Sequence, residues 1–257
     1  MRMPGLPEGW LTWPREEREK WVLVLAEMER REKTRAISRM YPDSGPLRRE
    51  LYPRHLEFFA AGAVHRERAF IAANRVGKTW GAGGYETALH LTGDYPAWWV
   101  GKRFVEPVRW WAAGKTNETT RDIVQATLLG PVTSEDGRKV CAGTGLIPGD
   151  LLGQFSWKAG VTDLVDTVQV RHKSGGWSTL GLKAYAQGRG AFEGAAQHGI
   201  WLDEEPTMEV YVECLTRTMT TDGMVLCTFT PLEGMSDVIL AFLHPELATN
   251  TETQNVS

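Results

Sequence analysis

The sequence predicts an α/β fold in which a mostly parallel sheet is flanked by helices. Apolar strand patterns and helix patterns alternate between residues 67 and 229, and such alternation is typical of parallel strands joined by helices that cover both faces. A phosphate-loop pattern at residues 72–79 stands between a strand and a helix, and an apolar run at residues 199–202 ends in acidic residues. Both features are expected at the carboxyl edge of a parallel sheet.

The N-terminal region predicts a charged amphipathic helix over residues 15–35. Its apolar residues are Trp21, Val24, Leu25 and Met28, which helical spacing places on one face. Two interpretations remain open for this stripe: a helix packed on the main domain, or an arm or lid that contacts a neighbouring subunit. The turn-rich residues 41–46 follow, and we expect a boundary near residue 50.

The remaining elements follow from the spacing of apolar residues. Strand patterns occupy residues 67–73, 107–113, 165–171, 178–185, 199–202 and 224–229. Helix patterns occupy residues 78–91, 117–129 and 207–219, and Glu118 suits the first turn of the second. Ser174-Gly175-Gly176 predicts a hairpin turn. Residues 130–160 are rich in Gly, Pro and Asp and predict a long loop, and the residues after Pro245 predict a polar linker or end.

Composition excludes several classes of protein. The 257 residues suit one large domain, or one domain with a lobe. Lys and Arg total 29 against 32 Asp and Glu, so a protein that coats nucleic acid by net charge alone is excluded. The three cysteines form no CxxC pair and the histidines are scattered, which argues against a disulfide scaffold or a zinc site. The sequence shows no apolar run near the ~18 residues of a membrane span, and we expect a soluble protein of a reducing compartment.

The strongest local signal is AANRVGKT at residues 72–79, which fits GxxxxGK[ST] at its last three positions and has Ala72 in place of the first Gly. Backbone N–H groups of such a loop wrap the β-phosphate, and Gly77 permits their close approach. Lys78 is expected to bridge the β- and γ-phosphates, and the Thr79 hydroxyl to ligate Mg²⁺. The expected nucleotide-binding residues are Ala72, Ala73, Asn74, Arg75, Val76, Gly77, Lys78 and Thr79, with Arg75 either touching the γ-phosphate or facing solvent.

The second signal is the acidic strand end at residues 203–205. Asp203 is expected to hold Mg²⁺ through its water shell, and Glu204 to polarise the attacking water as general base. Glu205 is either a spare surface carboxylate or a charge at a helix start. Standing alone, the motif would also suit a solvated turn. At the end of the next strand, Thr228 and Thr230 are either sensors of the γ-phosphate or ordinary β-strand residues.

Together these blocks resemble the large terminase subunit of tailed bacteriophages, in the branch that serves headful-packaging phages with short tails. The matching stretches are the Glu/Arg-rich N-terminal helix, YPRHLEFF, AANRVGKT, LTGDYPAWWVGKRF, GKTNETTRD, YAQGRGAFEG, IWLDEEP and CTFTPLEGMSD. The resemblance implies a P-loop ATPase of the additional-strand, catalytic-glutamate class. It also implies Mg²⁺ as cofactor, ATP as substrate, and double-stranded DNA, the portal protein and the small terminase subunit as partners. The expected setting is the host cytoplasm, with a homo-oligomeric ring when assembled and a monomer alone.

Carried over residue by residue, the resemblance gives Lys78 and Thr79 the phosphate-loop roles and makes Asp203 the Mg²⁺ residue. Glu204 becomes the catalytic base, and Thr228 and Thr230 fall in the family's coupling motif.

Two further residues are implied by the resemblance, each with an alternative. His55 stands where many relatives carry a Gln that reads adenine, although it also suits an ordinary helix start. Arg189 lies in the segment that supplies an arginine at the subunit contact, where such a residue stabilises the transition state. Its alternatives are an exposed arginine without a role, or Arg75 in its place.

The expected organisation is a helical arm or lid at 1–50, an ATPase motor domain at 51–245 and a tail or linker at 246–257. The family usually continues with a nuclease domain, which we do not expect within this chain. DNA contacts are expected either from basic residues interleaved with tryptophans at 98–111, or elsewhere if those tryptophans are core. Two rival functions are a helicase or other DNA-dependent translocase, and a non-catalytic ATP-binding assembly module.

Overall fold

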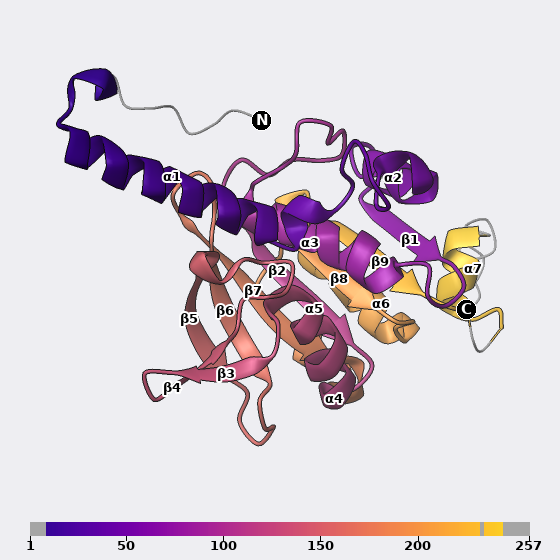
Figure 1. Cartoon of the computed structure of the whole chain (residues 1–257). Helices are drawn as coiled ribbons and strands as arrows, with labels where there is room; N and C mark the ends of the chain where they lie inside the picture. Colours follow the sequence, from indigo (N-terminus) through magenta and orange to yellow (C-terminus); the bar gives the residue numbers. More distant parts are fainter. Residues whose placement is uncertain (1–8, 232–233, 244–257) are drawn as a thin grey trace, which may run out of the picture.

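The computed structural model describes residues 9–231 and 234–243, and it contains a seven-stranded sheet (Figure 1). The strand order is β1-β9-β8-β2-β7-β6-β5. The strands are β1 (Glu67–Ile71), β2 (Arg109–Gly114), β5 (Leu152–Trp157), β6 (Val165–Arg171), β7 (Trp177–Ala184), β8 (Gly199–Asp203) and β9 (Met224–Phe229). All neighbours from β1 to β7 pair in parallel, whereas β6 runs antiparallel to β7 and β5. The predicted mostly parallel sheet and the β6–β7 hairpin are confirmed.

Helices follow most of the expected ranges. The α-helices are α1 (Arg15–Thr34), α2 (Pro53–Ala61), α3 (Tyr85–Thr92), α4 (Asn117–Thr119), α5 (Ala126–Leu129), α6 (Met208–Thr218) and α7 (Asp237–Leu243). Two π-helices, η4 (Lys78–Gly84) and η5 (Thr120–Gln125), lead into α3 and α5. Short 3₁₀ turns are η1 (Trp10–Thr12), η2 (Ile37–Arg39), η3 (Arg49–Leu51), η6 (Gly149–Leu151), η7 (Tyr185–Gln187), η8 (Arg189–Phe192) and η9 (Met219–Thr221).

Helices cover both faces of the sheet because side chains alternate along each strand. Trp110 of β2 and Trp201 of β8 point to one face, where they pack with residues of α2, α3 and α5. Trp111 of β2 and Ile200 of β8 point to the other face, where they pack with α6 and α7. Trp99 also lies in the first core with 3% exposure, so Trp99, Trp110 and Trp111 pack inside the protein, whereas Trp98 is partly buried against that core.

The expected long loop at residues 130–160 is wrong. It contains the antiparallel pair β3 (Val132–Glu135) and β4 (Arg138–Cys141), followed by β5. The turn of the pair is Asp136-Gly137, and both residues have left-handed φ values of 49° and 73°, a geometry that suits an Asp-Gly hairpin. The strands were hidden because β3 and β4 are mostly exposed and therefore lack an apolar pattern.

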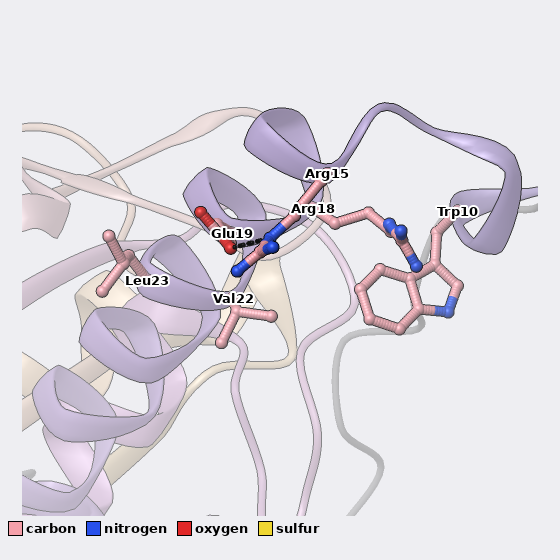
Figure 2. A pocket seen from close by; sticks show the side chains of 6 residues that line it. All are labelled: Trp10, Arg15, Arg18, Glu19, Val22 and Leu23. Atoms are coloured by element: carbon pink, nitrogen blue, oxygen red, sulfur yellow. Dashed lines mark hydrogen bonds and ion pairs between the residues drawn. The ribbon is translucent and has the colours of Figure 1, made fainter.

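The helix α1 extends beyond the body of the sheet at its N-terminal end (Figure 1). Trp21 packs edge-on against Trp13 with ring centroids 6.2 Å apart, but Val24 of the predicted apolar stripe is 44% exposed. Of the same stripe, Leu25 is half-buried and the Met28 side chain lies outside what the structure describes, so the arm or lid stays a prediction. A groove of about 530 Å³ lies beside it; its lining residues are Trp10, Arg15, Arg18, Glu19, Val22 and Leu23 (Figure 2).

Residues just after α1 belong to the main core. Tyr41 is 2% exposed and lies in the same apolar cluster as Phe59 and Tyr85. The boundary expected near residue 50 therefore cuts through a packed region. The expected tail at 246–257 lies outside the described residues. Among the described residues, none of the helices has the length and apolar character to cross a membrane.

Candidate nucleotide-binding site

The phosphate-loop segment joins the end of β1 to the start of η4. Arg75 and Gly77 both adopt left-handed backbone conformations, with φ values of 64° and 83°. Gly77 accepts this conformation without strain, whereas Arg75 is a non-glycine residue in a sparsely populated region. The Ala72 N–H donates to Phe229 O at 3.2 Å, which fixes the loop against β9. The loop is thereby held at the carboxyl edge of the sheet.

Lys78 is buried at the base of this loop. Its Nζ donates to Ala73 O at 2.7 Å and to Thr230 Oγ1 at 2.8 Å. Burial lowers the pKa of Lys78, and the nearby Glu204 and Asp203 carboxylates oppose that shift. The Thr230 hydroxyl lies 2.8 Å from Asn74 Oδ1 and 3.0 Å from Ala72 O, to either of which it can donate. One contact from the loop and one from the residue after β9 thus fix the position of the Lys78 ammonium group.

Asp203 ends β8 and faces Thr79 across β9. Its Oδ1 accepts hydrogen bonds from Thr79 Oγ1 at 2.9 Å and from Thr228 Oγ1 at 2.8 Å. Trp201 Nε1 donates to Thr228 Oγ1 at 2.7 Å, which orients that hydroxyl toward the carboxylate. Burial raises the pKa of Asp203 to about 7, against the opposing effect of the two hydroxyls and Lys78.

The donors at this point fit Mg²⁺ chemically. Thr79 and Asp203 provide hydroxyl and carboxylate oxygens, which Mg²⁺ prefers, and it normally keeps waters and substrate phosphates as further ligands. Within the described residues, no group of three or more His, Cys, Asp or Glu residues is placed to hold a metal by itself. The residues therefore suit an ion that arrives with a nucleotide and would not form a self-sufficient metal cage.

Glu204 and Glu205 have different surroundings. Glu204 has a left-handed φ of 66°, and its N–H donates to Thr228 O at 3.0 Å. It borders a cavity of about 280 Å³ together with Thr230 and Lys115. Glu205 lines the same cavity, but its Oε1 accepts a hydrogen bond from Ser236 Oγ, just before α7.

Tyr185 is a site residue that the sequence analysis gave no role. Its hydroxyl lies 2.9 Å from Asp203 O and 3.1 Å from Glu204 O, to either of which it can donate. It is buried, and burial raises its pKa well above the usual value, so the phenol stays protonated. Tyr185 begins the segment that carries Arg189 and thus ties that segment to the acidic strand end.

His55 lies beneath the phosphate loop. Its Nε2 donates to Val76 O at 3.0 Å, and its Nδ1 lies 2.6 Å from the Tyr41 hydroxyl. The side chain is 4% exposed. Both ring nitrogens are engaged within the protein, so this geometry favours support of the loop over the expected adenine contact.

Arg189 lies on η8 and contacts α6. Its Nε donates to Glu213 Oε2 at 2.9 Å, and it forms a longer ion pair of 3.8 Å with Glu193. Glu213 is buried, and its other oxygen pairs with Arg217 at 2.9 Å. The Arg189 side chain is 60% exposed. Within the described residues, Arg189 therefore pairs with acidic side chains of its own chain and not with the phosphate loop. Arg75, its rival, is exposed on the loop itself.

The structure brings most of the predicted site residues to one edge of the sheet. The loop at 72–79, the acidic end of β8 and the hydroxyls after β9 meet there, because Asp203 pairs in register with Thr228 and Ile71 with Phe229. The strand β9 lies between β1, which precedes the phosphate loop, and β8, which ends in the acidic residues. It is the strand that corresponds to the additional strand of the expected ATPase class. This combination of sheet, loop and acidic strand end defines a phosphate-loop nucleotide-binding fold.

The comparisons identify the family within this class. Residues 69–255 match the family model described as terminase large subunit, T4likevirus-type, N-terminal. The chain belongs to this terminase large-subunit family. It is 40% identical over 211 residues to the terminase large subunit of Salmonella phage P22, a match that covers 75% of this chain and 41% of that relative. The chain thus spans well under half the length of the curated relative that it matches.

Two solved structures are more distantly similar. The large terminase of a thermophilic bacteriophage is 12% identical with a TM-score of 0.45, and the match covers 69% of this chain and 37% of that one. The large terminase ATPase domain of Thermus phage P74-26 is 13% identical with a TM-score of 0.36, covering 67% and 62% of the two chains.

Proposed function

We propose that this chain hydrolyses ATP with Mg²⁺ and that hydrolysis drives double-stranded DNA into a procapsid. The observation that carries the proposal is the meeting of Lys78, Thr79, Asp203 and Glu204 at one edge of the sheet, in a chain of the terminase large-subunit family. A rival non-catalytic assembly module would have no use for Glu204 beside the loop.

Phosphate binding rests on residues 72–79. The loop N–H groups face the phosphates, and Lys78 exchanges its contacts with Ala73 O and Thr230 for phosphate oxygens. Because the hydroxyl of Thr230 loses its lysine partner in that exchange, Thr230 is suited to report whether phosphate is present. Thr79 and Asp203 are the residues that would hold a magnesium ion, which when bound would supply positive charge to neutralise the phosphates.

Water activation is assigned to Glu204. Its position directly after Asp203 places it beside the metal residue, and the cavity that it borders with Thr230 gives room for a water molecule. Glu204 takes a proton from that water as the water oxygen bonds to the γ-phosphorus, and the bond from that phosphorus to the β–γ bridging oxygen breaks, which releases ADP. Glu205, whose carboxylate is engaged by Ser236, plays no part in the step.

Arg189 is assigned to the neighbouring subunit's site. It is exposed, and its acidic partner Glu213 retains Arg217 as a second cation when Arg189 departs. Release of Arg189 therefore does not leave a buried carboxylate unpaired, which would be costly. An arginine delivered in this way stabilises the charge of phosphoryl transfer.

The partners and the assembled form in this proposal come from the family alone. The partners are the portal protein, the small terminase subunit and double-stranded DNA, and the working form is a homo-oligomeric ring in the host cytoplasm.

The bounds of the motor domain come from the packing. The motor domain in this proposal begins before Tyr41, because Tyr41 packs in its core.

The direct test is ATP hydrolysis with and without duplex DNA. Wild-type protein is expected to release phosphate, whereas Lys78→Ala is expected to lose both Mg·ATP binding and turnover. Lys173→Ala is the matched control, because Lys173 pairs with Asp94 away from the loop. Equal turnover by Lys78→Ala and wild type would place the site elsewhere. If wild-type protein binds Mg·ATP but releases no phosphate, the non-catalytic module is favoured.

A further inference from the structure

His55 and Tyr41 form a hydrogen-bonded pair that touches the phosphate-loop backbone at two points. His55 Nε2 lies 3.0 Å from Val76 O, and the Tyr41 hydroxyl lies 2.8 Å from Gly81 O. The two side chains are joined by the 2.6 Å contact between His55 Nδ1 and the Tyr41 oxygen. Val76 and Gly81 stand on either side of Lys78 in the chain. The pair therefore holds both flanks of the lysine.

The hydrogen positions in this pair follow from the chemistry of the partners. Burial lowers the pKa of His55, so the ring is neutral and carries one N–H. A carbonyl oxygen only accepts, and that hydrogen therefore sits on Nε2 and is donated to Val76. Nδ1 is left as an acceptor for the Tyr41 hydroxyl, which shares its single hydrogen between His55 Nδ1 and Gly81 O. Every polar atom of the imidazole is thus committed to the protein.

Two glycines make this close approach feasible. A Cβ atom at Gly81 would lie 2.9 Å from the Tyr41 hydroxyl oxygen and 3.0 Å from His55 Cε1. A Cβ atom at Gly77 would lie 3.1 Å from the same His55 carbon. All three distances are shorter than ordinary side-chain contacts, so a residue larger than Gly would push His55 and Tyr41 away from the loop.

Tyr41 is fixed from behind by the aromatic core. Its ring meets Tyr85 and Phe59 edge-on, with centroids 5.0 Å and 5.7 Å away. Such aromatic pairs add to the stability gained from burial alone. His55 and Tyr41 therefore link the phosphate loop to a packed part of the core.

We propose that His55 and Tyr41 are positioning residues that hold the phosphate loop in the shape that binds polyphosphate, whichever base the nucleotide carries. The proposal rests on the nucleotide-binding function proposed above and assigns His55 a task unlike base recognition. Support of the loop predicts equal losses for every ligand that carries a triphosphate. Recognition of adenine predicts a loss for ATP alone.

The test is calorimetric binding of Mg·ATP, Mg·GTP and Mg·tripolyphosphate to the full chain. In His55→Asn the amide occupies the place of Nδ1 and leaves Val76 without its donor, whereas in His55→Gln the amide nitrogen reaches the place of Nε2. Loss of a buried hydrogen bond of this kind corresponds to about tenfold, or ~1.4 kcal/mol. We expect His55→Asn to bind all three ligands about tenfold more weakly, and His55→Gln to stay within about threefold of wild type.

The matched control is His198→Asn, which makes the same chemical change at a half-buried histidine that accepts the Arg109 N–H. We expect this control to bind all three ligands like wild type. Tyr41→Phe and Gly81→Ala disturb the pair from its other side, and they decide the matter if circular dichroism shows that His55→Asn is unfolded. Both are expected to weaken all three ligands alike.

Three outcomes separate the ideas. A loss confined to Mg·ATP would overturn the proposal in favour of an adenine contact. Unchanged binding in folded His55→Asn, Tyr41→Phe and Gly81→Ala would overturn it in favour of a purely structural role. Failure of wild-type protein to bind any of the three ligands would instead refute the nucleotide-binding function itself.

Discussion

The sharpest stability prediction concerns Gly83, in the π-helix that follows the phosphate loop. A Cβ atom at this position would lie 2.1 Å from Trp201 Nε1 and 2.4 Å from Trp201 Cε2. Both distances are far shorter than a non-bonded contact, so the two side chains would clash. Trp201 is fully buried and donates its indole N–H to Thr228, which in turn donates to Asp203. Gly83→Ala must therefore move either the helix or the indole, and both movements disturb the site.

The expected cost has two parts. Overpacking a filled core costs about 1–3 kcal/mol, and leaving the buried indole N–H or its acceptor without a partner costs about 1–3 kcal/mol. We expect a combined loss of about 3 kcal/mol or more in the free energy of unfolding. For a domain of this size that loss lowers the thermal midpoint by about 6–12 °C.

Urea unfolding of Gly83→Ala, Trp201→Phe and the double variant measures this cost and assigns it to the contact. Phenylalanine lacks the indole nitrogen, so Gly83→Ala should cost about 1 kcal/mol or less when Trp201 is already Phe. Gly190→Ala is the stability control, because no atom of the described residues, its two chain neighbours aside, lies within 4 Å of its Cβ position. An equal cost of Gly83→Ala in both backgrounds, or a cost under about 0.5 kcal/mol in wild type, would refute the reasoning.

Three further predictions concern chemistry and charge. Glu204→Gln should retain Mg·ATP binding and lose ~10² or more in phosphate release, whereas Glu205→Gln should be nearly silent; an essential Glu205 would shift the base by one residue. Arg189→Ala should bind nucleotide but lose stimulated turnover, and mixing it with Glu204→Gln under assembling conditions should recover activity, whereas no recovery would contradict action between subunits. Burial holds the pKa of His90 below its usual value, so the unfolded chain takes up that proton first as pH falls below ~6.5. Wild type should therefore lose up to about 1 kcal/mol more stability than His90→Gln between pH 6.5 and 5.5, measured by urea unfolding at each pH. The comparison cancels the opposite contribution of Asp203, and parallel losses would place the proton elsewhere.

Local sequence patterns were sufficient to predict the sheet and the residues that meet at its carboxyl edge. The apolar runs before residues 72 and 203 had to end at one edge because parallel strands align their carboxyl ends, so Lys78 and Asp203 were predictable partners. The pair β3–β4 was missed because its side chains are mostly exposed and leave no apolar alternation. Only the Asp136-Gly137 turn signalled it.

Contacts between distant segments were beyond any local pattern. Tyr41 was assigned to a turn before the motor, yet 40 residues separate it from Gly81, whose carbonyl oxygen it contacts. Tyr185 and Trp201 were visible as aromatic residues, but no spacing rule indicates that their polar atoms converge on Asp203 and its neighbours. Such pairings depend on how helices pack on the sheet, which sequence periodicity does not specify.

The left-handed backbone of Glu204 places a cost in folding at the same residue to which we assign the general base. A non-glycine residue at φ 66° is disfavoured by roughly 1 kcal/mol relative to glycine, and the surrounding contacts of Tyr185 and Thr228 hold it there. Glycine would relax the backbone and remove the carboxylate. Selection for thermal stability alone, without a requirement for turnover, would therefore drift toward loss of this side chain, and a stabilised but inactive protein is the expected product of such an experiment.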